Sequence, residues 1–386
     1  MLVIELPNMS AIRGTLMKRI GNRRFLLSLV LVFSLFLMPA CRPEEVIPTP
    51  EPGPKAARET VVFVAGWGDT DDESFAGYWQ DGQWKGLSAC SDPGERPWRY
   101  ANAISVSGDD VYVGGYNGCD SKLVACYWKN GARTDLAHPA ADSHARSMCV
   151  SGDDVYIAGW LDFGDYTIPC YWTNGVCTEL SRLGPSRVDQ AEAIVLADGD
   201  VYVAGTVNRN PDASQMISSP CYWKNGERVD LKAYDTLNLG FGNSICVAQG
   251  KVYVAGHVAY GCSSMPCYWV DGVRYDLKKD VPGWANSIQV SGTDIYIAGM
   301  VQTGEGESYK TTPCVWKNKA RTDLDVADSG SAWSIFVLDQ NVFVAGFGNS
   351  GSYYHTPCYW KNGVRTDLVP GGYPGGCAHS VFATYK

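Results

Sequence analysis

Aromatic side chains recur at one defined point of this chain, directly after the glycine that ends each copy of a Val-Tyr-Val-Ala-Gly type of motif. Four of the seven residues at this point are aromatic and a fifth is histidine. Tyr and Trp combine a flat apolar face with a polar tip, which suits the binding of saccharides, peptides and proteins. The seven residues are Trp67, Tyr116, Trp160, Thr206, His257, Met300 and Phe347.

More aromatic residues follow in the segments after these positions, and we expect them on the same surface. The candidate binding face consists of the aromatic residues and the histidine named above together with Trp98, Trp284, Tyr353 and Tyr354. Large rings also cap the ends of sheets and shield a core from water, which is the alternative interpretation. Further aromatic residues of these segments are Tyr100, Phe163, Tyr166, Tyr260 and Tyr373.

The sequence offers less to catalysis or to metal binding. Asp69, Asp71, Asp72 and Glu73 lack the ligand spacing and the glycine of a calcium loop, so a solvated acidic loop is the simpler interpretation. The five histidines are scattered and show no metal-ligand spacing. There is no G-x-S-x-G and no phosphate-binding loop. We therefore predict no catalytic residue, no metal and no cofactor, the alternative being carboxylates that converge from different parts of the chain.

The glycine before each aromatic position belongs to a repeated unit. After it come a Cys-Tyr-Trp-Lys-Asn-Gly type of segment, an Arg-Thr-Asp-Leu type and an Ala-Asn-Ser-Ile type, all short and rich in β-branched and aromatic residues. Asn-Gly and Asp-Gly are typical of tight hairpins. A repeat of this length, built from short strands, predicts an all-β fold, a seven-bladed β-propeller with four antiparallel strands per blade. The unit recurs every 43 to 51 residues, at Gly66, Gly115, Gly159, Gly205, Gly256, Gly299 and Gly346.

The ends of the repeat region predict how the ring closes. The region begins with the second strand of a blade at residues 61–66 and ends with a first strand at residues 378–386. We expect the C-terminal strand to complete the first blade, which removes the open sheet edge. The hairpins between first and second strands and between third and fourth strands are short and uniform, whereas the other connections vary. These other connections share one face of the ring, the variable face, and this is where we expect a ligand to bind.

Seven tryptophans occupy one position of the repeat, whatever the neighbouring loops contain. This recurrence favours packing between blades over contact with a ligand. The residues are Trp79, Trp128, Trp172, Trp223, Trp269, Trp316 and Trp360.

The fourteen cysteines fall into classes. Six occupy one repeat position, where a small buried apolar residue is a simpler account than a metal site. Cys90 and Cys119 lie in variable segments around the second blade, and in an oxidising compartment they are candidates for a disulfide. The six repeat cysteines are Cys126, Cys170, Cys221, Cys267, Cys314 and Cys358.

The first 40 residues differ from the rest of the chain. Basic residues precede an apolar run from Phe25 to Ala40, and Cys41 follows. This order is similar to a bacterial lipoprotein signal peptide over residues 1–40, with Met17 as an alternative start and lipidation at Cys41. The alternatives are an ordinary signal peptide and an uncleaved anchor. A Pro- and Glu-rich tether at residues 41–59 would lead to the propeller at residues 60–386.

The net charge and the repeat sequence limit the classes of function that fit this chain. With 32 Lys+Arg against 41 Asp+Glu and no basic stripe, the chain is a poor partner for nucleic acid. The repeat resembles the HAF-type extracellular repeats of bacteria, with Cys-Tyr-Trp in place of Ala-Phe-Leu-Trp, and its strand order resembles kelch-type blades. These resemblances imply a propeller and no catalytic residue.

We expect a monomer in the bacterial cell envelope, lipid-anchored at the outer membrane through the N-terminus alone. Its expected function is that of an extracytoplasmic binding or adhesion module that recognises a saccharide, a peptide or a protein through the variable face. The alternative is an extracellular glycan hydrolase or lyase with acidic residues over the central channel.

Overall fold

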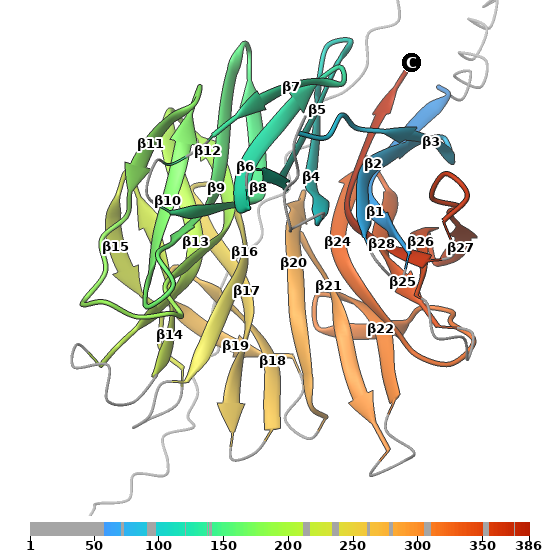
Figure 1. Ribbon diagram of the computed structural model, residues 1–386. Helices are drawn as coiled ribbons and strands as arrows, with labels where there is room; N and C mark the ends of the chain where they lie inside the picture. The colour runs from blue at the N-terminus through green and yellow to red at the C-terminus, as the bar shows by residue number, and fades with distance from the viewer. Residues whose placement is uncertain are drawn as a thin grey trace, which may run out of the picture. The chain divides into compact units, whose positions relative to one another are not determined.

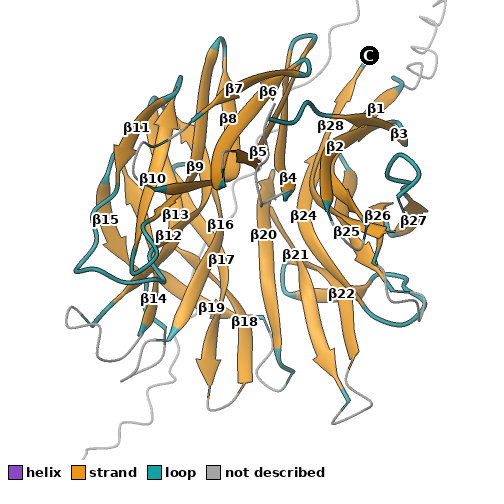
Figure 2. Cartoon of the chain, in the orientation of Figure 1, coloured by secondary structure: helices purple, strands orange, loops and turns teal. Residues whose placement is uncertain are grey.

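The short apolar segments of the repeat pair into seven four-stranded antiparallel sheets (Figure 1). The computed structural model describes residues 58–386 except 71–72, 91–97, 120, 137, 139–140, 211–216, 234–238, 261–262, 278–280, 305–309, 350–354 and 374. Within these residues the regular elements are strands, and none is a helix that could span a bilayer (Figure 2). The predicted seven-bladed β-propeller is confirmed.

Each sheet is one blade, and its strands follow one another from the central channel outward. Blade 1 comprises β28 (Gly375–Tyr385), β1 (Thr60–Asp69), β2 (Ser74–Gln80) and β3 (Gln83–Gly86); blade 2 comprises β4 (Arg99–Ser107), β5 (Asp110–Cys119), β6 (Lys122–Lys129) and β7 (Ala132–Asp135). Blade 3 comprises β8 (Asp142–Ser151), β9 (Asp154–Asp162), β10 (Thr167–Thr173) and β11 (Val176–Glu179); blade 4 comprises β12 (Gln190–Ala197), β13 (Asp200–Asn208), β14 (Ser218–Lys224) and β15 (Glu227–Asp230). Blade 5 comprises β16 (Gly240–Ala248), β17 (Lys251–Tyr260), β18 (Ser263–Val270) and β19 (Val273–Asp276); blade 6 comprises β20 (Gly283–Ser291), β21 (Asp294–Thr303), β22 (Lys310–Lys317) and β23 (Ala320–Asp323). Blade 7 comprises β24 (Gly330–Leu338), β25 (Asn341–Gly348), β26 (Thr356–Lys361) and β27 (Val364–Asp367).

The C-terminal strand closes the ring as predicted. β28 pairs with β1 from Thr60 opposite Tyr385 to Asp69 opposite Gly375, and in Figure 1 the red β28 lies beside the blue β1. Val381 of β28 is buried in one cluster with Val64 of β1 and with residues of blade 7. The innermost strands of successive blades are in contact all around the channel, including β24 with β28 and β28 with β4. The first blade therefore joins both ends of the repeat region, and no blade is left with a missing strand.

The hairpins between third and fourth strands show why the turn sequence repeats. Asn130 and Gly131 have φ angles of 51° and 83°, which suit a two-residue hairpin and which Gly adopts without strain. The side chain of the same Asn130 accepts a hydrogen bond of 2.9 Å from the backbone N–H of Val111 in the neighbouring strand. Equivalent bonds occur in all seven blades, so this turn residue fixes both the hairpin and the start of the second strand.

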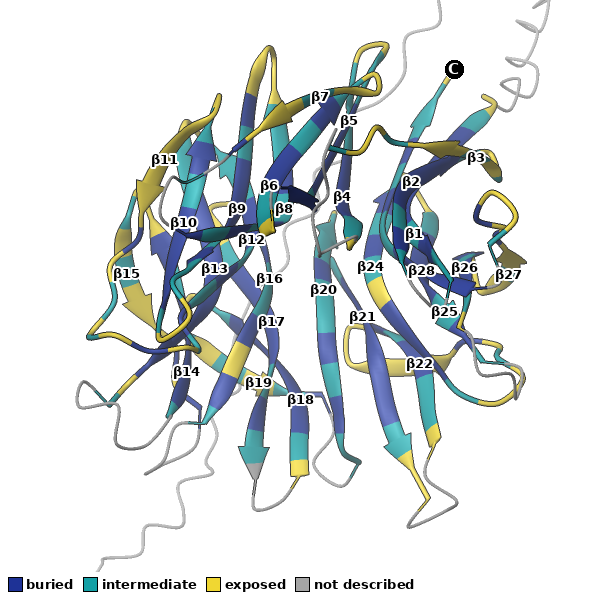
Figure 3. Cartoon of the chain, viewed as in Figure 1, coloured by how far each residue is buried: buried dark blue, intermediate teal, exposed yellow. Residues whose placement is uncertain are grey.

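The seven repeat tryptophans lie between blades and are buried, with at most 2% of their surface exposed. The indole N–H of Trp128, for example, donates to the carbonyl of Ser88 at the exit of the preceding blade, at 3.0 Å. Trp79, Trp223, Trp269 and Trp360 make the same kind of bond to the preceding blade. Buried residues run along the inner three strands of each blade, whereas the short outermost strands are exposed (Figure 3). These tryptophans therefore fasten each blade to its neighbour.

The predicted signal peptide, Cys41 and the tether up to residue 57 lie outside the described residues, as do Tyr353 and Tyr354.

Candidate functional site

Every innermost strand contains a β-bulge at the same position. In β4, Ala101 lies opposite Gly115 and Ala103 lies opposite Gly114, so Asn102 between them has no partner in β5. The same register shift occurs in the other six blades. A bulge bends the strand and redirects the extra side chain, and such features are frequent next to functional sites. The seven bulge residues are His379, Asn102, Arg146, Glu192, Asn243, Asn286 and Trp333, in blade order.

The repeated glycine is required by the bulge. A Cβ atom on Gly115 would lie 1.9 Å from the carbonyl oxygen of Tyr100, two residues before the bulge residue. A Cβ atom on any of the other six motif glycines would likewise lie between 1.7 and 2.1 Å from the equivalent carbonyl. Only a residue without a side chain tolerates this close approach of backbone. The glycines that reveal the repeat in the sequence therefore mark the bulges of the channel.

The bulge residues bridge neighbouring blades. The side-chain N–H of Asn102 donates to the carbonyl of Ala145 in the next blade at 2.7 Å, and Asn243 and Asn286 make the equivalent bond. The residue after the bulge is often serine, and its hydroxyl accepts from an amide of the next innermost strand, as Ser147 does from Ile194 at 3.2 Å. Each innermost strand is thereby held against the next.

Together the bulge residues surround a cavity of about 450 Å³ at the centre of the ring. All seven of them line it, along with the residues that follow the bulges. Most of the lining side chains are amides, hydroxyls or aromatic rings, and His257 and Trp284 of the predicted binding face are among them. A cavity of this size accommodates a small ligand or one end of a larger one.

A hydrogen-bond chain fixes the protonation state of His379. The indole N–H of Trp67 donates to Nε2 of His379 at 3.3 Å, so the ring proton sits on Nδ1, which lies 3.1 Å from Oδ1 of Asn102. Burial lowers the pKa of His379 to about 3, and the charge of Arg146 adds to the effect. The imidazole is therefore neutral at ordinary pH and presents a fixed tautomer.

Arg146 and Glu192 form the charged part of the ring. Nε of Arg146 lies 3.0 Å from Oε2 of Glu192 in the next blade, and the carboxylate raises the pKa of the guanidinium. Their side chains are 35% and 18% exposed, so both remain accessible from the cavity. Trp333, with 37% of its surface exposed, belongs to blade 7, which lies across the seven-membered ring from blades 3 and 4. The cavity thus has an aromatic side and a polar, ion-paired side.

The predicted aromatic residues divide between this cavity and other places. Trp67 reaches the cavity through its bond to His379, and its ring continues into a row of contacts through Tyr100, Tyr116 and His144 to Trp160, with centroids 4.9 to 5.2 Å apart. This aromatic row runs over blades 1 to 3 at the end of the ring where the variable connections begin. Burial raises the pKa of Tyr116 to about 12, so its hydroxyl stays protonated.

Other predicted residues lie apart from the cavity. Phe347 stacks on His355 at 4.1 Å between centroids and does not line it. Trp98 precedes β4 and is 44% exposed, but it too is outside the lining. Of the acidic cluster, Glu73 pairs with Arg99 at 3.5 Å. Among the described residues, no group of three or more His, Cys, Asp or Glu side chains is arranged to hold a metal ion.

The bulge residues were not singled out from the sequence, although a pattern there marks them. In each first-strand segment one variable residue stands between a small residue, Ala or Gly, and a Ser or Ala. Across the seven copies that residue is Asn, Arg, Glu, Asn, Asn, Trp and His. A position that varies in type inside a fixed frame of small residues is the expected pattern for side chains that line an open channel rather than fill a core.

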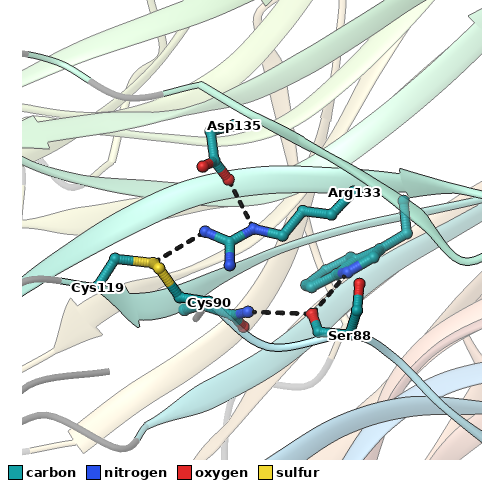
Figure 4. The surroundings of a disulfide bond; sticks show 7 residues. Ser88, Cys90, Cys119, Arg133 and Asp135 are labelled. Carbon is teal, nitrogen blue, oxygen red and sulfur yellow. Dashed lines mark hydrogen bonds and ion pairs between the residues drawn. A yellow bond between two sulfur atoms is a disulfide. The ribbon is translucent and has the colours of Figure 1, made fainter. Parts of the chain in front are cut away.

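Cys90 and Cys119 form a disulfide with their Cα atoms 5.6 Å apart (Figure 4). It joins the segment after blade 1 to the end of β5. Arg133 packs on it, with Nη2 2.9 Å from the Cys119 sulfur and Nε 2.6 Å from Oδ1 of Asp135. The six repeat cysteines are buried and unpaired, in keeping with a packing role.

No protein-family model matches the sequence, and no curated protein sequence matches it. Among solved structures, the chain is similar to the β-propeller domain of the Trilobed protease from Pyrococcus furiosus, with 11% identity, a TM-score of 0.47, and 82% of this chain and 94% of that one covered. It is also similar to a mutant of the Aleuria aurantia lectin in complex with Fucalpha1-6GlcNAc, with 13% identity, a TM-score of 0.37, and 71% and 97% covered. A mannose phosphorylase from Leishmania mexicana is similar at 11% identity and a TM-score of 0.35, with 60% and 85% covered. Likenesses at this level carry no argument about function.

Proposed function

We propose that this protein is a binding propeller that takes a saccharide into its central channel from the variable face. The observation that carries the proposal is the ring of seven bulge side chains around one cavity of about 450 Å³. Each bulge interrupts the regular strand pairing of its blade and directs one side chain toward the axis of the ring.

The chemistry of the lining supports a saccharide over a peptide. A sugar ring has apolar C–H faces and hydroxyl groups that both donate and accept hydrogen bonds. The exposed ring of Trp333 offers a stacking surface, and the Asn286 amide with the serine hydroxyls offers matching polar groups. An apolar peptide side chain would instead need an apolar pocket, and Ala103, Met148 and Ala193 are the non-aromatic apolar residues of the described lining.

The alternative of a glycan-cleaving enzyme requires two carboxylates about 5–10 Å apart across the sugar. Glu192 is the one carboxylate among the described residues that line the cavity, and it is ion-paired with Arg146. This arrangement favours binding over hydrolysis as the first hypothesis.

A glycan array and a peptide array probed with the purified full chain test the proposal. We expect glycan binding, reduced at least about tenfold, or ~1.4 kcal/mol, by Trp333→Ala. Trp98→Ala is the matched control, because Trp98 is also an exposed tryptophan but lies outside the cavity. If Trp98→Ala lowers binding and Trp333→Ala does not, the ligand lies on the loops instead. Release of reducing ends that Glu192→Gln abolishes would establish an enzyme.

We also propose that Cys41 is lipidated and holds the propeller at the cell envelope. What supports this is the order of basic residues, apolar run and cysteine at the N-terminus. Arg42, rather than Asp, follows the cysteine, which by analogy with enteric bacteria favours the outer membrane. Cells fed a fatty-acid analogue should label the wild type and leave Cys41→Ala unlabelled. Equal labelling of both would remove the proposal and leave the binding function untouched.

A further inference from the structure

The charges around the cavity cancel. The titratable side chains among its described lining residues are Arg146, Glu192, His257 and His379. Arg146 and Glu192 neutralise each other across 3.0 Å. The Trp67 N–H directed at Nε2 of His379 leaves no room for a second ring proton on that histidine.

His257 is neutral for a related reason. It stacks on Phe241 with ring centroids 4.8 Å apart, and it makes a T-shaped contact with Trp284 at 5.9 Å between centroids. Burial among these rings lowers its pKa to about 3. A charged ligand that enters the cavity would therefore meet no uncompensated counter-charge, and it would lose its own hydration.

The ion pair is more than a structural contact, because it is accessible and faces the aromatic side of the cavity. It places a guanidinium donor next to a carboxylate acceptor, and a hydroxyl group can accept from the first while it donates to the second. A carboxylate on the ligand would instead meet Glu192, and an ammonium group would meet Arg146. Because the pair is neutral as a whole, neither group would gain the net attraction that an unpaired counter-charge gives.

We infer that the ligand is an uncharged saccharide, and that the ion pair between Arg146 and Glu192 is the element that excludes charged sugars. This inference rests on the saccharide-binding function proposed above. With the ligand ring stacked on Trp333, its hydroxyl groups point across the channel to the pair.

Removing one member of the pair should change the preference in a defined direction. Glu192→Gln keeps the shape of the side chain, removes the negative charge and leaves Arg146 unpaired in the cavity. This variant should gain affinity for sugars that carry a carboxylate. The double variant Arg146→Gln with Glu192→Gln is neutral again and should return to uncharged sugars. Asp328→Asn is the control, because it unpairs Lys310, 2.6 Å away at the start of β22, outside the cavity.

The experiment uses an array of oligosaccharides that differ only in the end residue, glucose against glucuronic acid and galactose against galacturonic acid. We expect the wild type to prefer the neutral member at least about tenfold, and Glu192→Gln to reduce or reverse that ratio at least about tenfold. Asp328→Asn and the double variant should keep the wild-type order, with melting temperatures measured for all four proteins.

Three outcomes separate the claims. A wild type that binds the acidic sugars as well as the neutral ones overturns the inference but leaves saccharide binding intact. If Glu192→Gln melts like the wild type but leaves the ratio of neutral to acidic sugar binding unchanged, the ion pair does not select between the two kinds of sugar. No binding to any glycan overturns the proposed function itself.

Discussion

Two adjacent glycines of β5 allow a direct test of whether the bulge governs both stability and the site. Gly115 lies opposite Ala101, and a Cβ atom on it would lie 1.9 Å from the carbonyl oxygen of Tyr100. Its neighbour Gly114 stands where the other six blades have alanine. A Cβ atom on Gly114 would lie 3.5 Å from the Met148 sulfur, an ordinary van der Waals distance. Gly115→Ala and Gly114→Ala thus add the same methyl group one residue apart.

The two substitutions should act in opposite directions. At Gly115 the obstacle is a backbone carbonyl, which cannot rotate away as a side chain would, so the two strands must separate. Overpacking costs about 1–3 kcal/mol, and two weakened ladder hydrogen bonds cost about 1 kcal/mol each. We therefore expect Gly115→Ala to lower the free energy of unfolding by about 3–5 kcal/mol. Gly114→Ala should raise it by about 0.5–1 kcal/mol, because glycine in a strand interior loses more entropy on folding.

Thermal and urea unfolding followed by tryptophan fluorescence measure both changes. At about 2 °C per kcal/mol for a large domain, Gly115→Ala should melt about 6–10 °C lower and Gly114→Ala about 1–2 °C higher. Glycan binding, measured well below the melting temperature, should be lost in Gly115→Ala, because Asn102 is displaced from the cavity. A Gly115→Ala protein that melts within about 2 °C of the wild type would refute the claim that the bulge requires the glycine.

Three further predictions concern the rest of the ring. Lys319 has a φ angle of 72° at the turn position where the other six blades have glycine. Lys319→Gly should therefore raise the free energy of unfolding by about 1 kcal/mol. An unchanged urea midpoint would contradict strain at this turn. Burial raises the pKa of Asp189 from 3.8 to about 6, so the stability that this carboxyl contributes is full below about pH 4 and is lost as the pH rises through 6. Asp189→Asn should remove that slope from a stability profile between pH 4 and 7, and an identical profile would show that the carboxyl does not titrate there. Deleting residues 378–386 removes the buried Val381 and the partly buried Phe382, worth about 2–5 kcal/mol of burial together, and exposes the edge of β1. The protein should therefore aggregate or melt far lower, and a truncated chain that melts like the wild type would contradict the ring closure.

The fold was predictable because the same strand and turn segments recur in all seven blades. Hairpin turns such as Asn130-Gly131 have few alternatives for their φ angles, and the buried tryptophans fill the same space in each blade. The order of segments at the two ends of the repeat region was enough to predict that β28 completes the sheet of β1. These features depend on turn sequences and on packing within the sheets, and both can be inferred from one sequence.

The site was only partly predictable, because it depends on distances across the ring. His257 and Trp67 were predicted from their place directly after a motif glycine, and Trp284 from a variable connection; all three lie at or beside the cavity. Phe347 has an equivalent sequence position but turns to His355 instead. Nothing local in the sequence distinguishes these two outcomes, since the difference lies in which neighbouring ring each side chain meets.

The bulge residues show what a repeat can reveal beyond its own fold. Equivalent positions of seven blades meet the same backbone, so a residue type that the sheet dictates recurs, as Gly115 and Trp128 do. The bulge position is different: it is occupied by Asn102, Arg146 and Glu192 in successive blades, while its neighbours remain small. Packing within the sheet therefore does not determine the residue type at this position. The remaining environment is the axis that all seven blades share. Variation inside an otherwise uniform frame therefore supports the proposal that these side chains contact a ligand, and the steric demand on the glycine explains why the frame itself is uniform.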